Sequence, residues 1–281
     1  MNDHISRYVS DEHFAVSLVR AGKTCQLIGS EQHGLVGEPL RVLSQAVVCS
    51  LLLATRLKGR GLLTISLDTN GVFDYLRADA IGLGSVRAMI RPETHQQLSD
   101  WNGVDPLLGD GRFTLSRQLE GTAQPYQSVV AVSAAPLRDI INNFVRDSEQ
   151  VDAIMFTDIG ITDNQVSHAQ GIYIERMPGA AASEAGRHFD ELVAEPEQGL
   201  ALHALRDDDD LVRELFASDA FRLLHRYDVG FHCPCSAERY AATLRSFGPD
   251  QVKELVNGNG VIETECDFCR SRYAIPLDEV I

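Results

Sequence analysis

Four of the six cysteines of this 281-residue chain lie within its last fifty residues and form two close pairs. The pairs are Cys-Pro-Cys at 233–235 and Cys-Asp-Phe-Cys at 266–269, with thirty residues between them. Each short pair can supply one edge of a tetrahedral four-thiolate zinc site, and the segment between the pairs folds back to close it. The spacing therefore predicts one bound zinc ion, with the ligands Cys233, Cys235, Cys266 and Cys269.

The segment 232–281 is small enough that a metal would dominate its stability. A module of this size rarely folds on an apolar core alone, whereas zinc contributes about 10–16 kcal/mol in small finger peptides. Oxidation within each pair would give two local disulfides, lose the metal and remove the only long-range link. Two alternatives stay open: a purely structural zinc ribbon that docks a partner, and a thiol–disulfide oxidoreductase at Cys266 and Cys269. The second lacks the expected thioredoxin-like βαβ context, and His232 is expected to flank the ligands without joining them.

The charge balance excludes some partners. With 25 Lys+Arg against 40 Asp+Glu the formal net charge is −15, which disfavours nucleic acid and anionic membrane surfaces.

No secretory signal is visible, and the longest apolar run, at 46–54, is too short to span a bilayer. We expect a cytoplasmic protein, where thiols stay reduced and serve as metal ligands or redox groups. Nucleotide-binding and hydrolase motifs are missing or incomplete, so we expect no enzymatic activity and no catalytic or cofactor-binding residue.

Residues 1–177 have the pattern of one mixed α+β domain, rich in antiparallel strands. Apolar spacing predicts helices at 39–58 and 136–150. Strands are expected at 61–68, 72–79, 86–90, 113–119, 128–133, 153–157 and 171–176. A hairpin turn is expected at 70–71 and a further turn at 109–111, before the strand 113–119, whose expected partner is 128–133. Sequential hairpins with segregated helices favour an α+β fold over a doubly wound parallel sheet.

The composition changes after residue 177. Residues 178–231 have short helical patches and many charges, and we expect a metastable helical linker. Its acidic run at 207–210 is expected to be a solvated helix N-terminus, where the dipole favours negative charge. Residues 232–281 are expected to form a zinc-binding α+β module, with Ser236 capping a helix at 237–246 and Asp250 capping a second short helix.

The cysteine segments FHCPCSAERYAATLRSFG and NGNGVIETECDFCRSRYAI resemble the 33 kDa heat-shock chaperones, a family of redox-switched holdases. The resemblance extends through the chain, in DHISRY (3–8), ATRLKGRGLLTISL (54–67), FTLSRQLEGTAQPYQSVVAV (113–132), DSEQV (147–151) and GIYIERMPGA (171–180). It covers nearly the whole chain. Cys25 and Cys49 are not part of the family pattern, and we expect Cys49 to be a core thiol.

The resemblance implies an ATP-independent holdase that is inactive while reduced and zinc-bound. Oxidants together with unfolding conditions would form the disulfides Cys233–Cys235 and Cys266–Cys269 and release zinc. The C-terminal module and the linker would then unfold and expose a surface that binds unfolding client proteins. The resemblance also implies a homodimer on activation and transfer of clients to ATP-dependent foldases.

Overall fold

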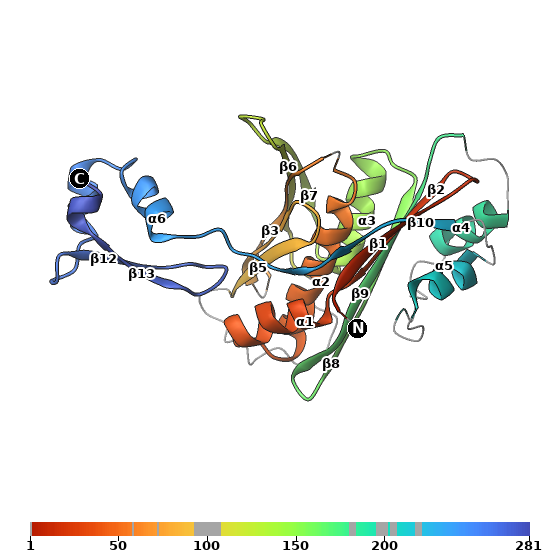
Figure 1. Ribbon diagram of the computed structural model, residues 1–281, viewed down its shortest axis with the longest axis horizontal. Helices are drawn as coiled ribbons and strands as arrows, with labels where there is room; N and C mark the ends of the chain where they lie inside the picture. Colours follow the sequence, from red (N-terminus) through yellow and green to blue (C-terminus); the bar gives the residue numbers. More distant parts are fainter. Residues whose placement is uncertain are drawn as a thin grey trace. The chain divides into compact units, whose positions relative to one another are not determined.

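The computed structural model describes residues 2–57, 59–71, 73–92, 108–179, 184–194, 202, 207–216 and 221–281 (Figure 1). The chain divides into two compact units, Met1–Phe231 and His232–Ile281. Both mix helices with mainly antiparallel strands, so the predicted α+β class is confirmed. Residues 178–231, expected to be a linker, belong to the first unit.

The first unit contains a five-stranded antiparallel sheet, sheet A, in the order β10-β1-β2-β9-β8. Its strands are β1 (His4–Ser10), β2 (Phe14–Arg20), β8 (Ala153–Thr162), β9 (Gln165–Arg176) and β10 (Phe221–Asp228). The strands β1 and β2 were not predicted, and β8 and β9 form a longer hairpin than the sequence indicated. β10 was not predicted: it lies in the expected helical linker and pairs antiparallel with β1, so the end of that segment completes the sheet.

A six-stranded sheet, sheet B, has the order β11-β5-β4-β3-β6-β7. Its strands are β3 (Gly61–Thr69), β4 (Phe73–Ile81), β5 (Ser85–Pro92), β6 (Gly111–Leu119), β7 (Tyr126–Val132) and the two-residue β11 (Gly230–Phe231). The predicted hairpins β3–β4 and β6–β7 are confirmed by their antiparallel registers. The predicted start of β4 at residue 72 lies outside the described residues.

The helix α2 (Gly37–Ala54) contacts strands of both sheets and forms the centre of the largest apolar cluster. It is the one helix among the described residues that is long and apolar enough to cross a membrane, but 78 % of it is buried in the unit. A helix that is apolar on all sides is expected at the centre of a core. Its predicted end at residue 58 lies outside the described residues. Around it lie α1 (Gly22–Cys25), the π-helix Gln26–Gln32 and α3 (Leu137–Asp147).

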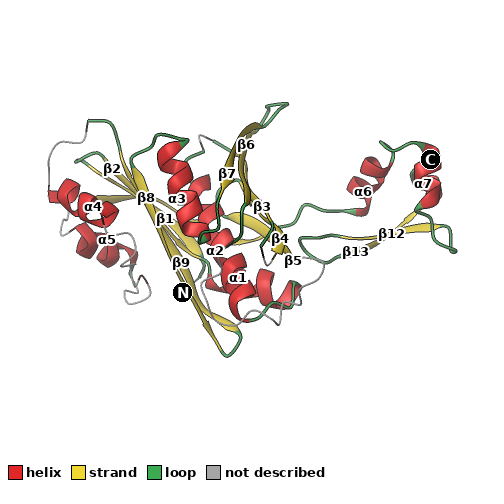
Figure 2. Ribbon diagram, turned by 180° about the vertical axis from the view of Figure 1, so that it is seen from behind, coloured by secondary structure: helices red, strands yellow, loops and turns green. Residues whose placement is uncertain are grey.

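A second apolar cluster lies between one face of sheet A and two helices of the expected linker, α4 (Glu184–Ala194) and α5 (Asp208–Phe216) (Figure 2). The sheet contributes Tyr8, Phe14, Val16, Leu18, Ile154, Phe156, Ile172 and Ile174. The linker contributes Ala185, Phe189, Leu202, Leu211, Val212 and Phe216. We call the eight sheet residues the covered face, because these linker residues keep them buried.

The acidic run at the start of α5 is only partly a solvated cap. Asp207 accepts hydrogen bonds from the N–H groups of Asp209 and Asp210, as a cap does. Asp208, in contrast, is 2 % exposed. The solvated interpretation is wrong for Asp208, because its carboxylate lies on sheet A and is compensated there by basic side chains.

The Asp208 cluster joins α5 to three strands of sheet A. The carboxylate accepts hydrogen bonds from Ser6 Oγ at 2.6 Å, Arg20 Nε at 2.6 Å and His4 Nε2 at 2.7 Å. A guanidinium nitrogen of Arg226, on β10, lies 3.5 Å from it. A buried carboxylate requires such partners, because an unpaired buried charge is strongly unfavourable. The linker is therefore held by a polar contact as well as by apolar packing.

The second unit contains α6 (Ala237–Leu244), α7 (Pro249–Glu254) and the hairpin of β12 (Val261–Glu265) and β13 (Arg272–Pro276), followed by a 3₁₀ turn at Leu277–Glu279. Its buried apolar residues are only Ala241, Val252, Ile262, Ile275 and Val280. Ser236 caps α6, as predicted. Gly248, and not Asp250, is the N-cap of α7, because Pro249 takes the first helical position.

Candidate metal centre

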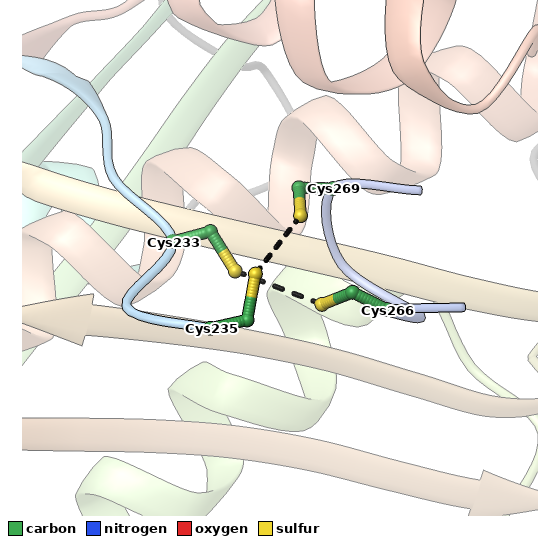
Figure 3. Close-up of side chains that lie close together, drawn as sticks. All are labelled: Cys233, Cys235, Cys266 and Cys269. Carbon is green, nitrogen blue, oxygen red and sulfur yellow. Dashed lines mark hydrogen bonds between the residues drawn. The ribbon is translucent and has the colours of Figure 1, made fainter. Parts of the chain in front are cut away.

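The structure brings the four C-terminal cysteines together at one end of the β12–β13 hairpin (Figure 3). All four sulfur atoms lie within 4.8 Å of one another. Two of the separations join the two sequence pairs: Cys235 to Cys269 at 3.3 Å and Cys233 to Cys266 at 3.7 Å. All four are free thiols. The thirty residues between the two cysteine pairs thus form α6, α7 and β12, and these elements return the chain to the first pair.

The second pair lies in a tight turn that follows β12. Cys266 donates its N–H to the carbonyl of Ser271 at 2.9 Å, and its own carbonyl accepts from the N–H of Arg270 at 2.8 Å. These bonds close a loop of six residues around the cysteine pair. To make this turn, Arg270 adopts a positive φ of 58°, a conformation that favours glycine. The backbone is therefore shaped around the sulfurs at some conformational cost.

The first pair is held by side chains of α6 and by its N-cap. A guanidinium nitrogen of Arg239 donates to the carbonyl of Pro234 at 2.6 Å, and Ser236 Oγ accepts from the N–H of Arg239 at 3.2 Å. The hydroxyl of Tyr273, on β13, lies 3.1 Å from Cys235 Sγ. Tyr273 and Tyr240 also pack ring against ring at 5.2 Å. These contacts were not predicted, although both tyrosines lie within five residues of a cysteine.

The surroundings make the four thiols chemically unequal. Burial opposes ionisation of Cys266, but hydrogen bonds from the N–H groups of Cys269 and Phe268 and from Tyr240 outweigh it and lower the pKa of Cys266 to about 7. Burial raises the pKa of Cys235 to about 12. The hydrogen bond between Cys235 and the Tyr273 hydroxyl raises the pKa of Tyr273 to about 12. Cys266 therefore ionises more readily than Cys235.

The donor set fits a zinc ion. Zinc prefers four thiolates in a tetrahedron, and Zn–S bonds of about 2.3 Å place the sulfurs about 3.8 Å apart. The separations of 3.3 and 3.7 Å lie close to this value. With four sulfur ligands no coordination position remains for a catalytic water, so the site has the character of a structural centre. His232 is outside this cluster of sulfurs.

The fold and the site define a two-unit α+β protein whose C-terminal unit contains a cluster of four thiols that could hold a metal ion. The chain belongs to the Hsp33 family, whose sequence model, described as "Hsp33 protein", matches residues 3–276. It is 25 % identical over 268 residues to the 33 kDa chaperonin of Bacillus subtilis, covering 92 % of this chain and 91 % of that protein. It is also 25 % identical over 256 residues to the 33 kDa chaperonin of Levilactobacillus brevis, with 89 % and 86 % covered.

A solved structure shares the fold. The crystal structure of the 33 kDa chaperonin, an Hsp33 homolog, from Thermotoga maritima matches with a TM-score of 0.82 and 18 % sequence identity. The match covers 99 % of this chain and 96 % of that one. The arrangement of sheets and helices is therefore kept at a low level of sequence identity.

Replacing Arg270 by glycine is expected to stabilise the C-terminal unit. The positive φ costs a non-glycine residue about 1–2 kcal/mol, and the exposed ion pair of Arg270 with Glu265 is worth about 0–1 kcal/mol. Arg270→Gly should thus raise the thermal midpoint of zinc release. Arg272→Gly is the control, because Arg272 also pairs with Glu265 but lies in a strand. Equal or lower stability of Arg270→Gly relative to Arg272→Gly would contradict the argument.

The two remaining cysteines are expected to be inert in the folded protein. Cys25 and Cys49 are 1 % and 0 % exposed, and burial raises the pKa of Cys49 to about 12 and that of Cys25 further still. Iodoacetamide, added with a metal chelator, should label the four C-terminal cysteines and spare these two. Mass spectrometry of peptides would show it, with urea-unfolded protein as the control that labels all six. Comparable labelling of Cys49 without urea would show that the core opens readily.

Proposed function

We propose that this protein is a redox-regulated, ATP-independent holdase chaperone of the cytoplasm, with no enzymatic activity. The observation that carries the proposal is the pairing of a four-thiol centre with a small core in the same unit. Five buried apolar residues are few for a stable module, so the unit depends on the metal that its thiolates bind. A chemical change at the sulfurs is thereby converted into a change of fold.

Bound zinc supplies a cross-link between segments thirty residues apart. Cys233 and Cys235 give up two electrons and form one disulfide, and Cys266 and Cys269 form the other. Each pair reduces one molecule of hydrogen peroxide, taking up two protons to give two water molecules. Disulfides are poor zinc ligands, because only the thiolate binds the metal. After oxidation within the pairs no covalent or metal link joins the segments, and the unit unfolds.

The expected consequence in the first unit is release of the linker and exposure of the covered face. This face is made of eight large apolar side chains on adjacent strands. Exposed apolar patches of more than a few hundred Å² mark surfaces that bind other proteins. Family membership and the names of the relatives, chaperonins, support clients that are unfolding proteins. We propose, from the family resemblance, that the active form is a homodimer that passes its clients to ATP-dependent foldases.

The test follows zinc and client protection in the same sample. Hydrogen peroxide is added to the zinc-loaded protein at mildly raised temperature, zinc is measured with a chromogenic chelator, and aggregation of heat-unfolding citrate synthase is recorded by light scattering. Zinc release with suppressed aggregation, both reversed by reductant, is the expected result. Retained zinc, or release without protection, would overturn the proposal and leave a constitutive structural zinc module as the function of the C-terminal unit.

A further inference from the structure

A cavity of about 970 Å³ lies between sheet A and one end of sheet B. Sheet A contributes side chains of β1 and β10. Sheet B contributes the start of β3 with the segment before it, and the ends of β4 and β6 with the turns that follow them. All of these elements belong to the first unit. None of the described lining residues belongs to the cysteine cluster or to the covered face, so the cavity is a separate feature of the molecule.

Part of the lining is aliphatic. Leu62 and Ile81 lie opposite each other on β3 and β4. Leu83, in the turn after β4, and Leu119, at the end of β6, are 37 % and 39 % exposed. Leucines in contact with water can be buried by a ligand, and ligand sites commonly combine such apolar walls with a few polar groups. The lining therefore suits a ligand with an aliphatic body.

Two arginines of the lining are without an ionic partner. Arg7 lies on β1, and Arg60 lies in the segment before β3. Within the part of the chain that the structure describes, neither guanidinium group forms an ion pair. Glu120, the acidic residue of the described lining, pairs with neither of them. Opposite Arg7, on β10, His225 adds a ring nitrogen to the lining.

The lack of carboxylate partners sets these two arginines apart from the others. The chain has 40 Asp+Glu against 25 Lys+Arg, and most arginines described in the first unit pair with a carboxylate. Arg56 and Arg117, for example, share Glu149. A guanidinium group is a planar set of donors that matches the geometry of a carboxylate. Two unpaired guanidinium groups at one cavity therefore indicate a site for an anion.

We propose that this cavity binds a small carboxylate with an aliphatic body, with its charged group at Arg7 and Arg60 and its chain against the leucines. The two arginines and the single Glu120 leave one excess positive charge in the described lining when the histidine is neutral. One excess charge matches a monoanion better than a multiply charged phosphate.

The occupied cavity would also hold the linker strand in place. His225 and Tyr227 belong to β10, which pairs with β1 (Figure 1), and the rest of the described lining lies outside the linker. A ligand that contacts both sides is lost when β10 leaves β1, so it stabilises the docked state. This consequence rests on the proposed function, in which the linker is released. The bound carboxylate raises the threshold for that release.

The probe is sodium octanoate, added to the full-length, reduced, zinc-loaded protein and measured by equilibrium dialysis. Inorganic phosphate supplies charge without an aliphatic body, and 1-octanol supplies the chain without the charge. We expect saturable binding of about one octanoate per chain and weaker binding of both comparison compounds. At an octanoate concentration of about nine times its Kd, amide hydrogen exchange of β10 should slow about tenfold.

Three variants test the residues of the site. Arg7→Gln is expected to raise the Kd of octanoate about tenfold, through the loss of one charge-assisted hydrogen bond. Arg222→Gln is the matched control, because Arg222 is an exposed arginine of β10, without an ion pair to any described residue, outside the lining. Glu120→Gln removes the carboxylate of the lining and should instead lower the Kd about two- to threefold. Partial unfolding cannot improve binding, so this variant keeps the proposal testable if Arg7→Gln folds poorly.

The outcomes separate the site from the switch. Equal affinity of the three variants for octanoate would overturn the site, and so would binding no tighter than that of 1-octanol or phosphate. Octanoate binding without slower exchange of β10 would overturn the coupling to the linker. These measurements use reduced protein and no client. Failure of the oxidised protein to protect citrate synthase would therefore refute the chaperone function while the binding result stands.

Discussion

Asp208→Ala is expected to release the linker from sheet A without any oxidation. The substitution removes the carboxylate that His4, Ser6 and Arg20 contact at 2.6–2.7 Å and leaves buried positive charge uncompensated. Breaking a buried ion pair from one side costs about 3–5 kcal/mol. Amide exchange in α5 should therefore accelerate by about two to four orders of magnitude. The reduced, zinc-loaded variant should also suppress aggregation of citrate synthase.

Asp210→Ala is the matched control for this experiment. Asp210 also lies in the first turn of α5, but its side chain is 62 % exposed and its ion pair is with Arg213 on the same helix. An exposed pair of this kind is worth at most about 1 kcal/mol. If Asp208→Ala exchanges no faster than Asp210→Ala, the Asp208 cluster does not hold the linker. Zinc content should be unchanged in both variants, because the substitutions leave the cysteines intact.

The Asp208 cluster also gives linker docking a pH dependence. His4 Nδ1 faces the carbonyl of Asn2 at 2.8 Å while Nε2 faces Asp208. Both partners are acceptors, so His4 makes both bonds only as an imidazolium, and the hydrogen bond that it donates to Asp208 raises the pKa of His4. The contribution of charged His4 to the stability of linker docking is complete below the ordinary histidine pKa of about 6.5. It is lost as the pH rises through the raised pKa of His4.

At acid pH the carboxylate decides the outcome. Burial opposes ionisation of Asp208, but hydrogen bonds from His4, Ser6 and Arg20 hold its pKa well below the ordinary range. Its contribution is present above about pH 4 and is lost as the pH falls through the lowered pKa. Docking of α5 should be strongest between about pH 4 and 6.5. Amide hydrogen-exchange rates of α5, corrected for the pH dependence of intrinsic exchange, test this pH range. In His4→Gln the loss of docking at higher pH should disappear. A corrected exchange rate that does not change with pH in the wild type would contradict the prediction.

Cys266→Ser is expected to unfold the C-terminal unit while the first unit stays folded. The substitution removes one of the four proposed zinc ligands, which is 2 % exposed, in a unit with five buried apolar residues. The lost metal contribution, about 10–16 kcal/mol in small zinc modules, exceeds what such a core supplies. Exchange protection of β12 and β13 should disappear, and the zinc content should fall from about one ion per chain, the stoichiometry that a four-thiolate site predicts, toward zero.

Cys49→Ser is the control for a cysteine substitution outside the site. Cys49 is fully buried in α2, so serine there buries a hydroxyl and weakens the first unit while zinc binding is kept. Full zinc content and a protected β12–β13 hairpin in Cys266→Ser would show that the unit folds without its metal. That result would also remove the physical basis for coupling oxidation to unfolding.

The metal centre was the part most open to prediction from sequence. Two close cysteine pairs impose a short-range constraint that survives any choice of fold, and the structure brings the four sulfurs within 4.8 Å. The contacts around them were not predictable in the same way. Tyr273 reaches Cys235 only because β13 returns beside β12. The positive φ of Arg270 could not be read from the sequence, because such a backbone conformation is normally indicated by a glycine.

The fold of the first unit was predictable where strands pair with their neighbours in sequence. β3 and β4 are joined at the Asn70–Gly71 signal, and the glycine turn at 109–111 marks the start of β6, whose partner β7 was expected from its apolar pattern. The β8–β9 hairpin turns instead at Asp163 and Asn164, with φ of 52° and 61°, a turn without glycine. β1 and β2 are also neighbours in sequence and were missed, because residues 11–13 between them contain no glycine; the other partner of β1, β10, is distant. The burial of Asp208 depends on residues about two hundred positions away, so its local sequence indicates only a helix cap.

The pairing of β1 with β10 has a consequence for synthesis on the ribosome. His4 lies opposite Asp228, so one edge of the first strand stays open until nearly the whole first unit has been translated. At about 5–20 residues per second this interval lasts roughly 10–45 s. Pairings between such distant segments also fold slowly, because a long loop must close first. The nascent chain thus leaves one edge of its first strand unpaired for most of its synthesis.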